Sequence, residues 1–390
     1  MAKNTIFSLK KCKDLRGKRV FLRCDFNVPV KDGKIMDDSR ILSNLPTIRF
    51  LLRYKCRIIL ATHFGQPKGK DKKYSTKIIS DYLSKILNRN IIFMDSCYGG
   101  RVSVAVSKME EGDILFLENL RFEEGEEKND PVLAKRLAGL AQIYVNNAFG
   151  VSHRVHASVS AIKKYLPSYA GLLLEDEVVN LNKILNPKKP LISVIGGAKI
   201  GTKIKLIKNL LKKSEEVLIG GALANNFFVA HKLAVGKSLV DLESVKIAEK
   251  LKSKNIILPI DAIVSNKIDG GEARIKKITD IGPDEIILDI GPKTIKLFAN
   301  YIKKANSIIW NGPLGMFENE HYKHGTIAVA SVIASRSRGK AFGAVGGGET
   351  IEALKQTKME DYIDWVSSGG GAMLSYLGGE KMPGLEGLIK

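Results

Sequence analysis

Short apolar runs alternate along the chain with longer stretches in which apolar residues recur at helical spacing. In the first half, such runs predict strands near residues 19–24, 57–62, 91–94, 114–117 and 142–146. In the second half they predict strands near residues 191–195, 217–219, 256–260, 286–290, 307–310, 341–345 and 363–366. Continuous apolar runs joined by helical stretches are typical of buried parallel strands in βα units. The pattern therefore predicts an α/β protein.

The residues that follow these runs change in type at mid-sequence. In the first half the runs end in acids, amides, Arg or His, as at Asp25-Phe26-Asn27, His63 and Glu118-Asn119-Leu120-Arg121. In the second half they end in glycine clusters at 196–197, 220–221, 346–348 and 369–371. Ligands of open parallel sheets bind beyond the carboxyl ends of the strands. We therefore expect two lobes with different ligands, a small anion in the first and a nucleotide phosphate chain in the second.

The length of 390 residues allows two domains, each with its own core. We expect two Rossmann-like parallel-sheet lobes joined by a hinge helix. The first lobe is expected over residues 1–170 and the second over residues 191–375. Between them, a helical pattern from Leu172 to Leu185 and a segment with Pro187 and Pro190 indicate a hinge helix and connector over residues 171–190. Residues 376–390 form a C-terminal tail that can pack back on the N-terminal lobe.

Composition indicates a soluble globular chain, with 44% apolar and 26% charged residues. No apolar stretch approaches the roughly 18 residues of a membrane span. Residues 1–19 are polar and basic and lack the apolar segment of a secretory signal. The four cysteines form no C-x-x-C pair and are expected to be reduced, as in cytoplasmic proteins. We therefore expect a cytoplasmic protein with no membrane partner.

The formal net charge of +21 raises the question of a nucleic-acid partner. The lysines, however, are spread along amphipathic stretches, without interleaved aromatics and without helix-turn-helix, RNP or zinc-finger spacing. A Lys-rich composition together with polyanionic substrates accounts for the charge more simply. No specific nucleic-acid binding is expected.

The segment Gly196-Gly197-Ala198-Lys199-Ile200-Gly201-Thr202-Lys203 follows a predicted strand and opens a helical pattern. It nearly matches a P-loop, but Thr202 and Lys203 stand in swapped order, so it is not a Walker A motif. Glycines let backbone N–H groups approach an anion, and Lys199 and Lys203 are expected to share one helical face. Cations at a helix N-terminus cost about 0.3–1 kcal/mol each unless a polyanion binds there. Tight strand–helix packing is the alternative role of the glycine pair.

Two glycine triplets repeat this arrangement, in Gly346-Gly347-Gly348-Glu349-Thr350 and in Ser367-Ser368-Gly369-Gly370-Gly371-Ala372. Three consecutive glycines are conformationally costly, which favours close backbone approach to a ligand. Glu349 offers a hard oxygen ligand suited to Mg²⁺ on a nucleotide. Its alternative role is that of a surface residue at a helix start.

Four arginines of the first half, Arg23, Arg40, Arg121 and Arg154, fall at or just after predicted strand ends, together with His63. Guanidinium groups give planar, two-pronged contacts to carboxylate and phosphate. Asp25 and Asn27 can hold hydroxyl groups. Together these residues indicate a small phosphorylated hydroxy acid as ligand, although any one arginine alone is typically a solvated surface residue.

These residues belong to a set of motifs in which the chain closely resembles phosphoglycerate kinases along nearly its whole length. The matching stretches are Arg23-Cys24-Asp25-Phe26-Asn27-Val28-Pro29, Asp38-Ser39-Arg40, His63-Phe64-Gly65, Glu118-Asn119-Leu120-Arg121-Phe122, Ala148-Phe149-Gly150, His153-Arg154, Gly196-Gly197-Ala198-Lys199, Trp310-Asn311-Gly312-Pro313-Leu314-Gly315, Glu318 and the two glycine triplets. So many ordered motifs are very specific to this family.

The resemblance implies reversible phosphoryl transfer from 1,3-bisphosphoglycerate to Mg-ADP, giving 3-phosphoglycerate and Mg-ATP, by a hinged monomer. The substrate-binding residues it implies are Asp25, Phe26, Asn27, Arg40, His63, Phe64, Gly65, Gln66, Arg121 and Arg154. The nucleotide-binding residues it implies are Gly197, Lys199, Lys203, Gly221, Asn311, Pro313, Glu318, Gly347, Gly348, Glu349 and Thr350, with Glu349 toward Mg²⁺. Arg40, Lys203 and Gly370 are the expected catalytic residues.

The expected mechanism needs no general base, because the acceptor carboxylate is already ionised. Catalysis would consist of positioning and charge stabilisation. Some positions depart from the usual family pattern: Gln66 replaces an Arg, Asn147 an Asp, Glu349 an Asp, Ser368 a Thr and Ser375 a Glu. Because Arg40, Arg121, Arg154 and Lys203 are present, we expect an active enzyme with weakened substrate affinity.

Two alternatives come from other functional classes. A catalytically weakened relative acting as a basic binding protein predicts salt-sensitive association with nucleic acid and no turnover. A dinucleotide-dependent oxidoreductase would require a G-x-G-x-x-G opening its first βαβ unit, with an acid about 20 residues further on. The chain has no such fingerprint, which argues against the oxidoreductase.

Overall fold

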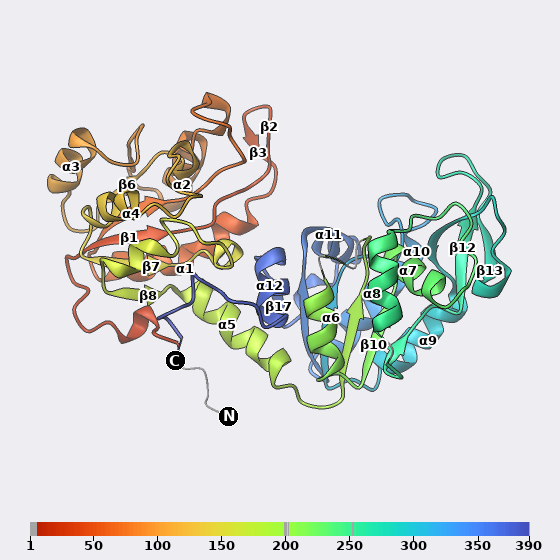
Figure 1. The fold of residues 1–390 in the computed structure, drawn as a ribbon. Coiled ribbons are helices and arrows are strands. Elements are labelled where there is room, and N and C mark those ends of the chain that lie inside the picture. Colours follow the sequence, from red (N-terminus) through yellow and green to blue (C-terminus); the bar gives the residue numbers. More distant parts are fainter. Residues whose placement is uncertain (1–5, 199–200, 202, 252, 390) are drawn as a thin grey trace. The chain divides into compact units, whose positions relative to one another are not determined.

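The computed structural model describes residues 6–198, 201, 203–251 and 253–389. The chain divides into two compact units. In Figure 1 unit 1 runs from red to yellow-green and also includes the blue C-terminal segment, while unit 2 runs from green to blue. Unit 1 comprises Met1–Val178 and Lys381–Lys390, and unit 2 comprises Val179–Glu380. The division falls inside α5 (Leu172–Leu185). Each unit contains a six-stranded sheet, which confirms the predicted α/β class with two parallel-sheet lobes.

The sheet of unit 1 has the strand order β5-β6-β4-β1-β7-β8, and all its pairings are parallel. The predicted strands are present, each one or two residues shorter than expected, while β8 was not predicted. Their bounds are β1 Arg19–Arg23, β4 Arg57–Ala61, β5 Ile92–Phe93, β6 Ile114–Phe116, β7 Ile143–Asn146 and β8 Ser168–Ala170. A short hairpin of β2 (Val30–Lys31) and β3 (Lys34–Ile35) follows β1.

Helices cover both faces of this sheet, because successive strand residues point to opposite sides. Val20 and Leu22 of β1 join one core with apolar residues of α1 (Ser39–Arg53) and α2 (Lys77–Leu87). Phe21, between them, joins the other core with α3 (Gly100–Ser107) and α4 (Pro131–Ala138). Burial on both faces is what makes the strands read as continuous apolar runs.

The C-terminal segment 381–390 clusters with unit 1. The amide of Gly384 donates to the carbonyl of Ser152 at 2.8 Å, and Phe7 donates to the carbonyl of Leu388 at 2.7 Å. The Lys163 ammonium donates to two tail carbonyls, that of Pro383 at 2.5 Å and that of Glu386 at 2.6 Å. Partial burial lowers the pKa of Lys163 to about 8.

The main sheet of unit 2 has the order β11-β10-β9-β15-β16-β17, again with parallel pairings. Its strands are β9 Leu191–Ile195, β10 Glu216–Ile219, β11 Ile256–Ile257, β15 Ser307–Asn311, β16 Phe342–Gly346 and β17 Trp365–Ser367. The helices are α6 Ile204–Leu211, α7 Ala222–Ala230, α8 Leu242–Lys250, α9 Pro292–Ile302, α10 His324–Ser337, α11 Gly348–Gln356 and α12 Gly370–Leu377. Trp310, fully buried, lies in the core that β15 shares with α9 and α10.

Unit 2 also contains a three-stranded antiparallel sheet that the apolar pattern did not predict. It has the order β13-β12-β14, with bounds Arg274–Lys277, Asp261–Ser265 and Ile286–Ile290. The predicted strand at 286–290 exists, but it pairs with β12 in this small sheet rather than with the main one. Most of β13 is exposed, so it lacks the apolar run that marks a buried strand.

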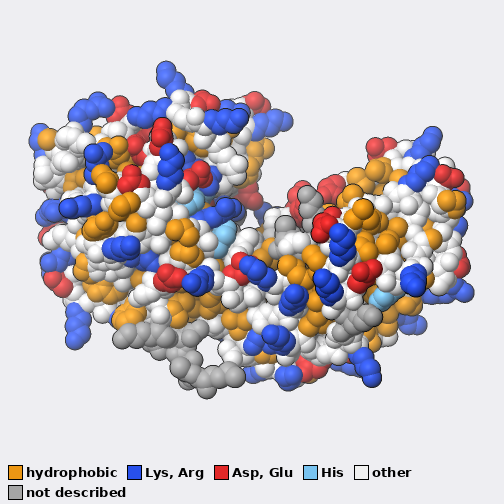
Figure 2. Space-filling view, in the orientation of Figure 1, with side chains coloured by type: hydrophobic (Ala, Val, Ile, Leu, Met, Phe, Trp, Pro, Cys, Tyr) orange, Lys and Arg blue, Asp and Glu red, His pale blue; other side chains and the backbone are white. Residues whose placement is uncertain are grey.

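The surface of the described residues is polar and basic. Figure 2 shows Lys and Arg side chains spread over the visible face of each unit rather than gathered in one patch. Cys24, Cys56 and Cys97 are buried and Cys12 is half-buried, and all four are free thiols. None of the described helices combines the length and the apolar content that a membrane crossing would need.

Candidate active site

The end of β1 brings a carboxylate and a guanidinium together. Asp25 follows this strand, and Arg40 projects from the first turn of α1. The Arg40 Nη1 atom lies 3.3 Å from each carboxylate oxygen of Asp25 and 3.3 Å from the carbonyl oxygen of Asn27. Burial opposes ionisation of Asp25, but the neighbouring cations, Arg40 foremost, hold its pKa below the usual range. The carboxylate is therefore charged and fixes the orientation of Arg40.

His63, after β4, is buried and neutral near pH 7. Burial and the nearby arginines lower its pKa to about 3, against the opposing effect of Asp25. Its Nδ1 lies 3.3 Å from Nη2 of Arg23, and a guanidinium can only donate. The proton of the imidazole therefore sits on Nε2, which leaves His63 a hydrogen-bond donor on its other side.

Arg23 supports this arrangement from the interior. Its side chain is fully buried and donates to Ser158 Oγ at 2.9 Å and to the carbonyl of Cys24. Ser158 Oγ in turn donates to the buried Glu126 at 2.5 Å. Arg23 was among the arginines that the sequence placed at strand ends. Its buried hydrogen bonds give it a supporting role rather than that of a solvent-facing anion ligand.

The loop after β4 is fixed by residues from two other strand ends. The Gly65 amide donates to Asn27 Oδ1 at 2.9 Å, and the Arg121 guanidinium donates to the Gly65 carbonyl. Gly65 has φ +62°, and a Cβ there would lie 2.2 Å from the Tyr74 ring, so only glycine fits. Phe64 is buried, with only 5% of its surface exposed, and so holds this loop from inside.

Phe26, one of the expected substrate-binding residues, lies in the core. Its ring stacks on Phe116 at 5.9 Å between centroids, and its amide donates to Thr62 Oγ1 at 3.0 Å. The side chains of Gln66 and Arg154, by contrast, are exposed. Arg121 is part-buried beside Glu127, at 3.1 Å, and its pKa is lowered chiefly by burial.

Asn119 organises two parts of this site, although the sequence gave it no role. Its Oδ1 accepts from the amides of Phe64 at 3.1 Å and Arg121 at 3.0 Å. Its Nδ2 donates to the carbonyls of Phe64 at 2.6 Å and Tyr74 at 2.9 Å. The available signal was an amide residue three positions after the buried strand β6. We call Asp25, Asn27, Arg40, His63 and Arg121 the unit 1 site.

Unit 2 contains a cavity of about 430 Å³. Its walls are largely apolar, with residues from the glycine turns, α7 and the three-stranded sheet. Five expected nucleotide-binding residues line it: Gly197, Gly221, Pro313, Glu318 and Glu349. Volume and apolar lining are those of a small-molecule site. We call it the unit 2 cavity.

The glycine turns of this cavity serve both close packing and access. A Cβ on Gly196 would lie 2.0 Å from the Pro313 carbonyl oxygen, so Gly196 is required by contact with the neighbouring strand end. Gly197 has φ +92° and Gly221 φ +63°, and both line the cavity. Close packing thus explains why residue 196 is glycine. A ligand-binding role of Gly197 stays a prediction.

Lys203 lies immediately before α6, which begins at Ile204. The expectation that it stands on a helical face is therefore wrong, and Lys199 lies outside the described residues. The Lys203 ammonium donates to the Gly196 carbonyl at 2.6 Å. Burial lowers the pKa of Lys203 to about 8, partly offset by the carboxylate of Glu349.

The remaining expected residues join the ends of β15, β16 and β17. Asn311 Nδ2 donates to the Gly346 carbonyl at 2.7 Å, and Thr350 Oγ1 accepts from the Gly312 amide at 2.7 Å. A Cβ on Gly370 would lie 3.0 Å from Gly347 Cα, so the two glycine triplets are neighbours. Gly348 is exposed at the start of α11. Backbone amides of two helix starts are therefore brought close together.

Comparison with known proteins identifies the family. The sequence profile of phosphoglycerate kinase matches residues 9–380. The chain belongs to the phosphoglycerate kinase family. A phosphoglycerate kinase of Wolbachia from Drosophila simulans is 44% identical over 98% of both chains, and one of Thermosipho africanus is 44% identical over 95% of both.

Solved structures of phosphoglycerate kinases share the fold of this chain. The enzyme from Coxiella burnetii matches with a TM-score of 0.88 at 37% identity, covering 98% of this chain and 99% of that one. The enzyme from Pyrococcus horikoshii matches with a TM-score of 0.86 at 31% identity, covering 98% of each chain. As a member of this family the chain is a phosphotransferase, acting between phosphoglycerate and a nucleotide. None of these findings supports a basic binding protein or an oxidoreductase.

The lowered pKa of Lys203 predicts an alkaline limit for this enzyme. The ammonium is charged below pH about 8 and neutral above it, and only the charged form attracts nucleotide phosphates. We expect kcat/KM for ATP, which reports the free enzyme, to fall above that pH. Initial rates from about pH 6 to about pH 10 measure it. Lys203→Arg, which stays charged, should lose this alkaline limb; identical limbs in both enzymes would contradict the assignment.

Proposed function

We propose that the unit 1 site holds 3-phosphoglycerate or 1,3-bisphosphoglycerate and that the unit 2 cavity holds ADP or ATP. The observation that carries the proposal is the unit 2 cavity. Its apolar walls suit a nucleotide base, and glycine turns, Lys203 and Glu349 supply the groups that bind a phosphate chain.

In the unit 1 site, three arginines would neutralise the triose phosphate. Arg40 and Arg121 are already oriented by Asp25 and Gly65, while Arg154 is an exposed cation free to move. The Asp25 carboxylate is suited to accept a hydrogen bond from the substrate hydroxyl. The Nε2–H of neutral His63 is suited to donate to a substrate carboxyl oxygen. Phe26 and Phe64 would act by holding the loops that carry these groups.

Mg²⁺ is expected to arrive with the nucleotide. Mg²⁺ is typically held by one or two carboxylates together with substrate phosphates and water. Glu349 lines the unit 2 cavity, and the described residues contain no cluster of three or more His, Cys, Asp or Glu that would form a dedicated cage. The residues present fit a metal shared with the phosphates. When bound, Mg²⁺ would neutralise charge on the transferring phosphoryl group.

The reaction we propose depends on position and charge. The acceptor is the carboxylate of 3-phosphoglycerate, which is ionised without help, so no general base is required. Arg40, Lys203 and the backbone amides around Gly370 would stabilise the charge of the transferring phosphoryl group. Water would otherwise hydrolyse the acyl phosphate product, so a closed state is needed during transfer.

We propose residues 171–190 as the hinge for that closure, since α5 carries the boundary between the two units. Residues 376–390 would form the tail, of which 381–390 clusters with unit 1. A monomeric, cytoplasmic enzyme acting in glycolysis accords with the family and with the free thiols of the chain.

Gln66 provides the first test of activity. It stands where the family usually has an Arg, at an exposed position after the loop that Arg121 holds. Because an exposed cation is screened, we expect Gln66→Arg to lower the KM for 3-phosphoglycerate by at most about tenfold, which is 1.4 kcal/mol. The assay is phosphoryl transfer from Mg-ATP to 3-phosphoglycerate with the acyl phosphate trapped.

The same assay decides the proposed function. Turnover by the wild-type chain supports it and shows that the missing Arg is dispensable. Turnover only in Gln66→Arg would place a defect in the unit 1 site. Absence of turnover in both would refute the assignment of these sites and direct attention to Glu349.

A further inference from the structure

A series of buried hydrogen bonds links the start of α5 to the interior of unit 1. The Leu172 amide donates to Thr47 Oγ1 at 3.0 Å, and this hydroxyl donates to Asn147 Oδ1 at 3.0 Å. The Leu173 amide also donates to Asn147 Oδ1, at 3.2 Å. The first amides of a helix lack partners within the helix. Thr47 and Asn147 therefore cap α5 from other parts of the chain.

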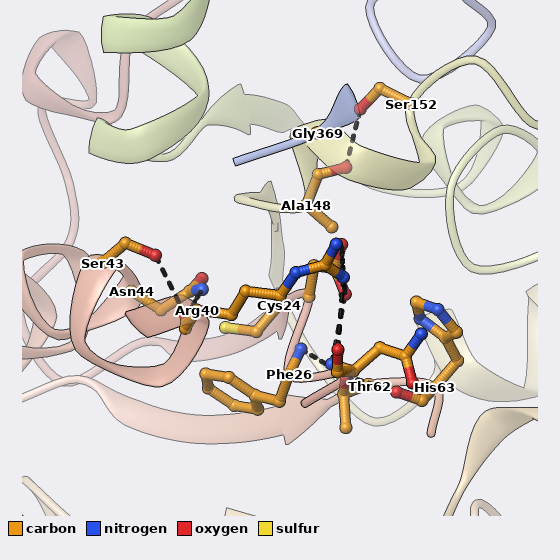
Figure 3. Close-up of polar contacts among 12 residues, drawn as sticks. Cys24, Phe26, Arg40, Ser43, Asn44, Thr62, His63, Ala148, Ser152 and Gly369 are labelled. Carbon is orange, nitrogen blue, oxygen red and sulfur yellow. Dashed lines mark hydrogen bonds and ion pairs between the residues drawn. The ribbon is translucent and has the colours of Figure 1, made fainter. Parts of the chain in front are cut away.

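The same series continues from Asn147 to the helix that bears Arg40. Asn147 Nδ2 donates to Asn44 Oδ1 at 2.7 Å. Asn44 Nδ2 donates to the Arg40 carbonyl at 2.8 Å (Figure 3). Ser43 Oγ donates to the same carbonyl at 3.0 Å. Asn44, Thr47 and Asn147 have no exposed surface. All these residues belong to unit 1.

The orientation of both amides is determined by their partners. The Leu173 amide can only donate, so Asn147 must turn its oxygen toward it and its nitrogen toward Asn44. Asn44 must then accept with its oxygen, which leaves its nitrogen for the Arg40 carbonyl. Only one orientation of the two amides gives a hydrogen-bond partner to Oδ1 and Nδ2 of both Asn44 and Asn147. A buried network in which each amide oxygen and nitrogen has a partner restrains the orientation of its members.

Arg40 depends on this support more than an ordinary helical residue does. It lies in the first turn of α1, and Pro46 inside that helix removes one backbone hydrogen bond. Its guanidinium contacts, to Asp25 and to the Asn27 carbonyl, are all 3.3 Å long. Asp25 can orient the guanidinium only while the backbone of α1 holds Arg40 within this distance, so the position of the side chain also depends on where that backbone lies.

We infer that Asn147 is a positioning residue for Arg40, acting through Asn44, and that it couples Arg40 to the first turn of α5. This inference rests on the proposed role of Arg40 in the unit 1 site. The inference also explains why this chain has Asn at position 147, where the family usually has Asp. The amide nitrogen of Asn147 is required because it donates to the oxygen of Asn44.

An aspartate at 147 would conflict with Asn44. One carboxylate oxygen could still accept from Thr47 and Leu173, but the other would face Asn44 Oδ1 in a buried setting. The oxygen of Asn147 lies against Gly171, where even a Cβ would come within 2.1 Å of it. Asn44 can relieve the conflict only by giving up the Arg40 carbonyl.

The test is a set of three variants assayed with 3-phosphoglycerate and Mg-ATP. Asn147→Asp should lower kcat/KM for 3-phosphoglycerate by about 10-fold to 100-fold and leave KM for ATP within about twofold. Asn44→Ala should give a smaller loss of the same kind. In Asn44→Ala/Asn147→Asp the opposing oxygen is gone, so we expect kcat/KM to recover by about tenfold over Asn147→Asp alone.

Three controls distinguish a positioning role from a general loss of structure. Asn90→Asp makes the same chemical change at an exposed position and should match the wild type. Thermal unfolding reports whether each variant is folded. If Asn147→Asp is unfolded, Asn44→Ala alone tests the positioning role, through a loss in kcat/KM for 3-phosphoglycerate without a change in KM for ATP. Arg40→Ala with full activity would refute the proposed role of Arg40 itself. A double variant no better than Asn147→Asp, or equal losses toward both substrates, would overturn the positioning role.

Discussion

Replacing Lys203 by Ala is expected to reduce phosphoryl transfer by about a thousandfold or more while leaving 3-phosphoglycerate affinity within about twofold. Removing one preorganised donor from a developing charge typically costs about 10²–10³ in kcat, and in the proposed site this ammonium would also attract the nucleotide. The ammonium is half-buried, and burial lowers its pKa to about 8. Trapped acyl phosphate measures turnover, and calorimetric titration with 3-phosphoglycerate measures binding.

Lys208→Ala is the matched control for this prediction. Lys208 is an exposed lysine of α6, the helix that begins directly after Lys203. Its removal changes the net charge equally and should leave both quantities unchanged. If Lys203→Ala weakened 3-phosphoglycerate binding as strongly as it reduced turnover, the assignment of Lys203 to the nucleotide phosphates would be wrong.

Replacing Arg40 by Ala should reduce phosphoryl transfer nearly as much as Lys203→Ala. In this variant, however, we expect weaker binding of 3-phosphoglycerate rather than of the nucleotide. We expect kcat to fall by about 10²–10³ and the Kd for 3-phosphoglycerate to rise at least tenfold, with ATP affinity unchanged. The variant should also raise the pKa of Asp25, because Arg40 is the cation that lowers it most. Calorimetry with each substrate and an NMR titration of the carboxyl group would measure these effects.

The Arg40→Lys variant distinguishes the contribution of the positive charge of Arg40 from that of the planar shape of its guanidinium group. An ammonium keeps the charge but lacks the planar fork of a guanidinium, so we expect an intermediate loss. Arg49→Ala, at an exposed position of the same helix, should behave like the wild type. An Arg40→Ala enzyme with normal 3-phosphoglycerate affinity would remove this residue from the substrate site.

The parallel strands could be predicted because burial on both faces makes them continuous apolar runs. The expected strand at 19–24 is β1 over Arg19–Arg23, and that at 57–62 is β4 over Arg57–Ala61. The same reasoning could not find β13, most of which is exposed, or assign Ile286–Ile290 to the small antiparallel sheet. Local pattern marks a strand, whereas its pairing depends on segments far away in sequence.

Site residues could be predicted where a strand end carries unusual chemistry. Asp25, His63 and Arg121 each follow a strand, and the structure places them in one unit 1 site. The supporting residues could not be found in this way. Asn119 bonds Phe64 across 55 positions, and Asn147 bonds Asn44 across 103. The spacing of residues within a short segment cannot predict such long-range contacts.

The α/β class, the two lobes, the family and the types of residue at each strand end could all be read from the chain alone. Apolar runs, glycine clusters and ordered motifs are local properties, so they need no knowledge of packing. Which of those residues face a ligand and which support it follows from the folded arrangement, as with buried Arg23 and Phe26. The charge of His63 does so too, because burial and neighbouring cations determine its pKa and both arise from packing.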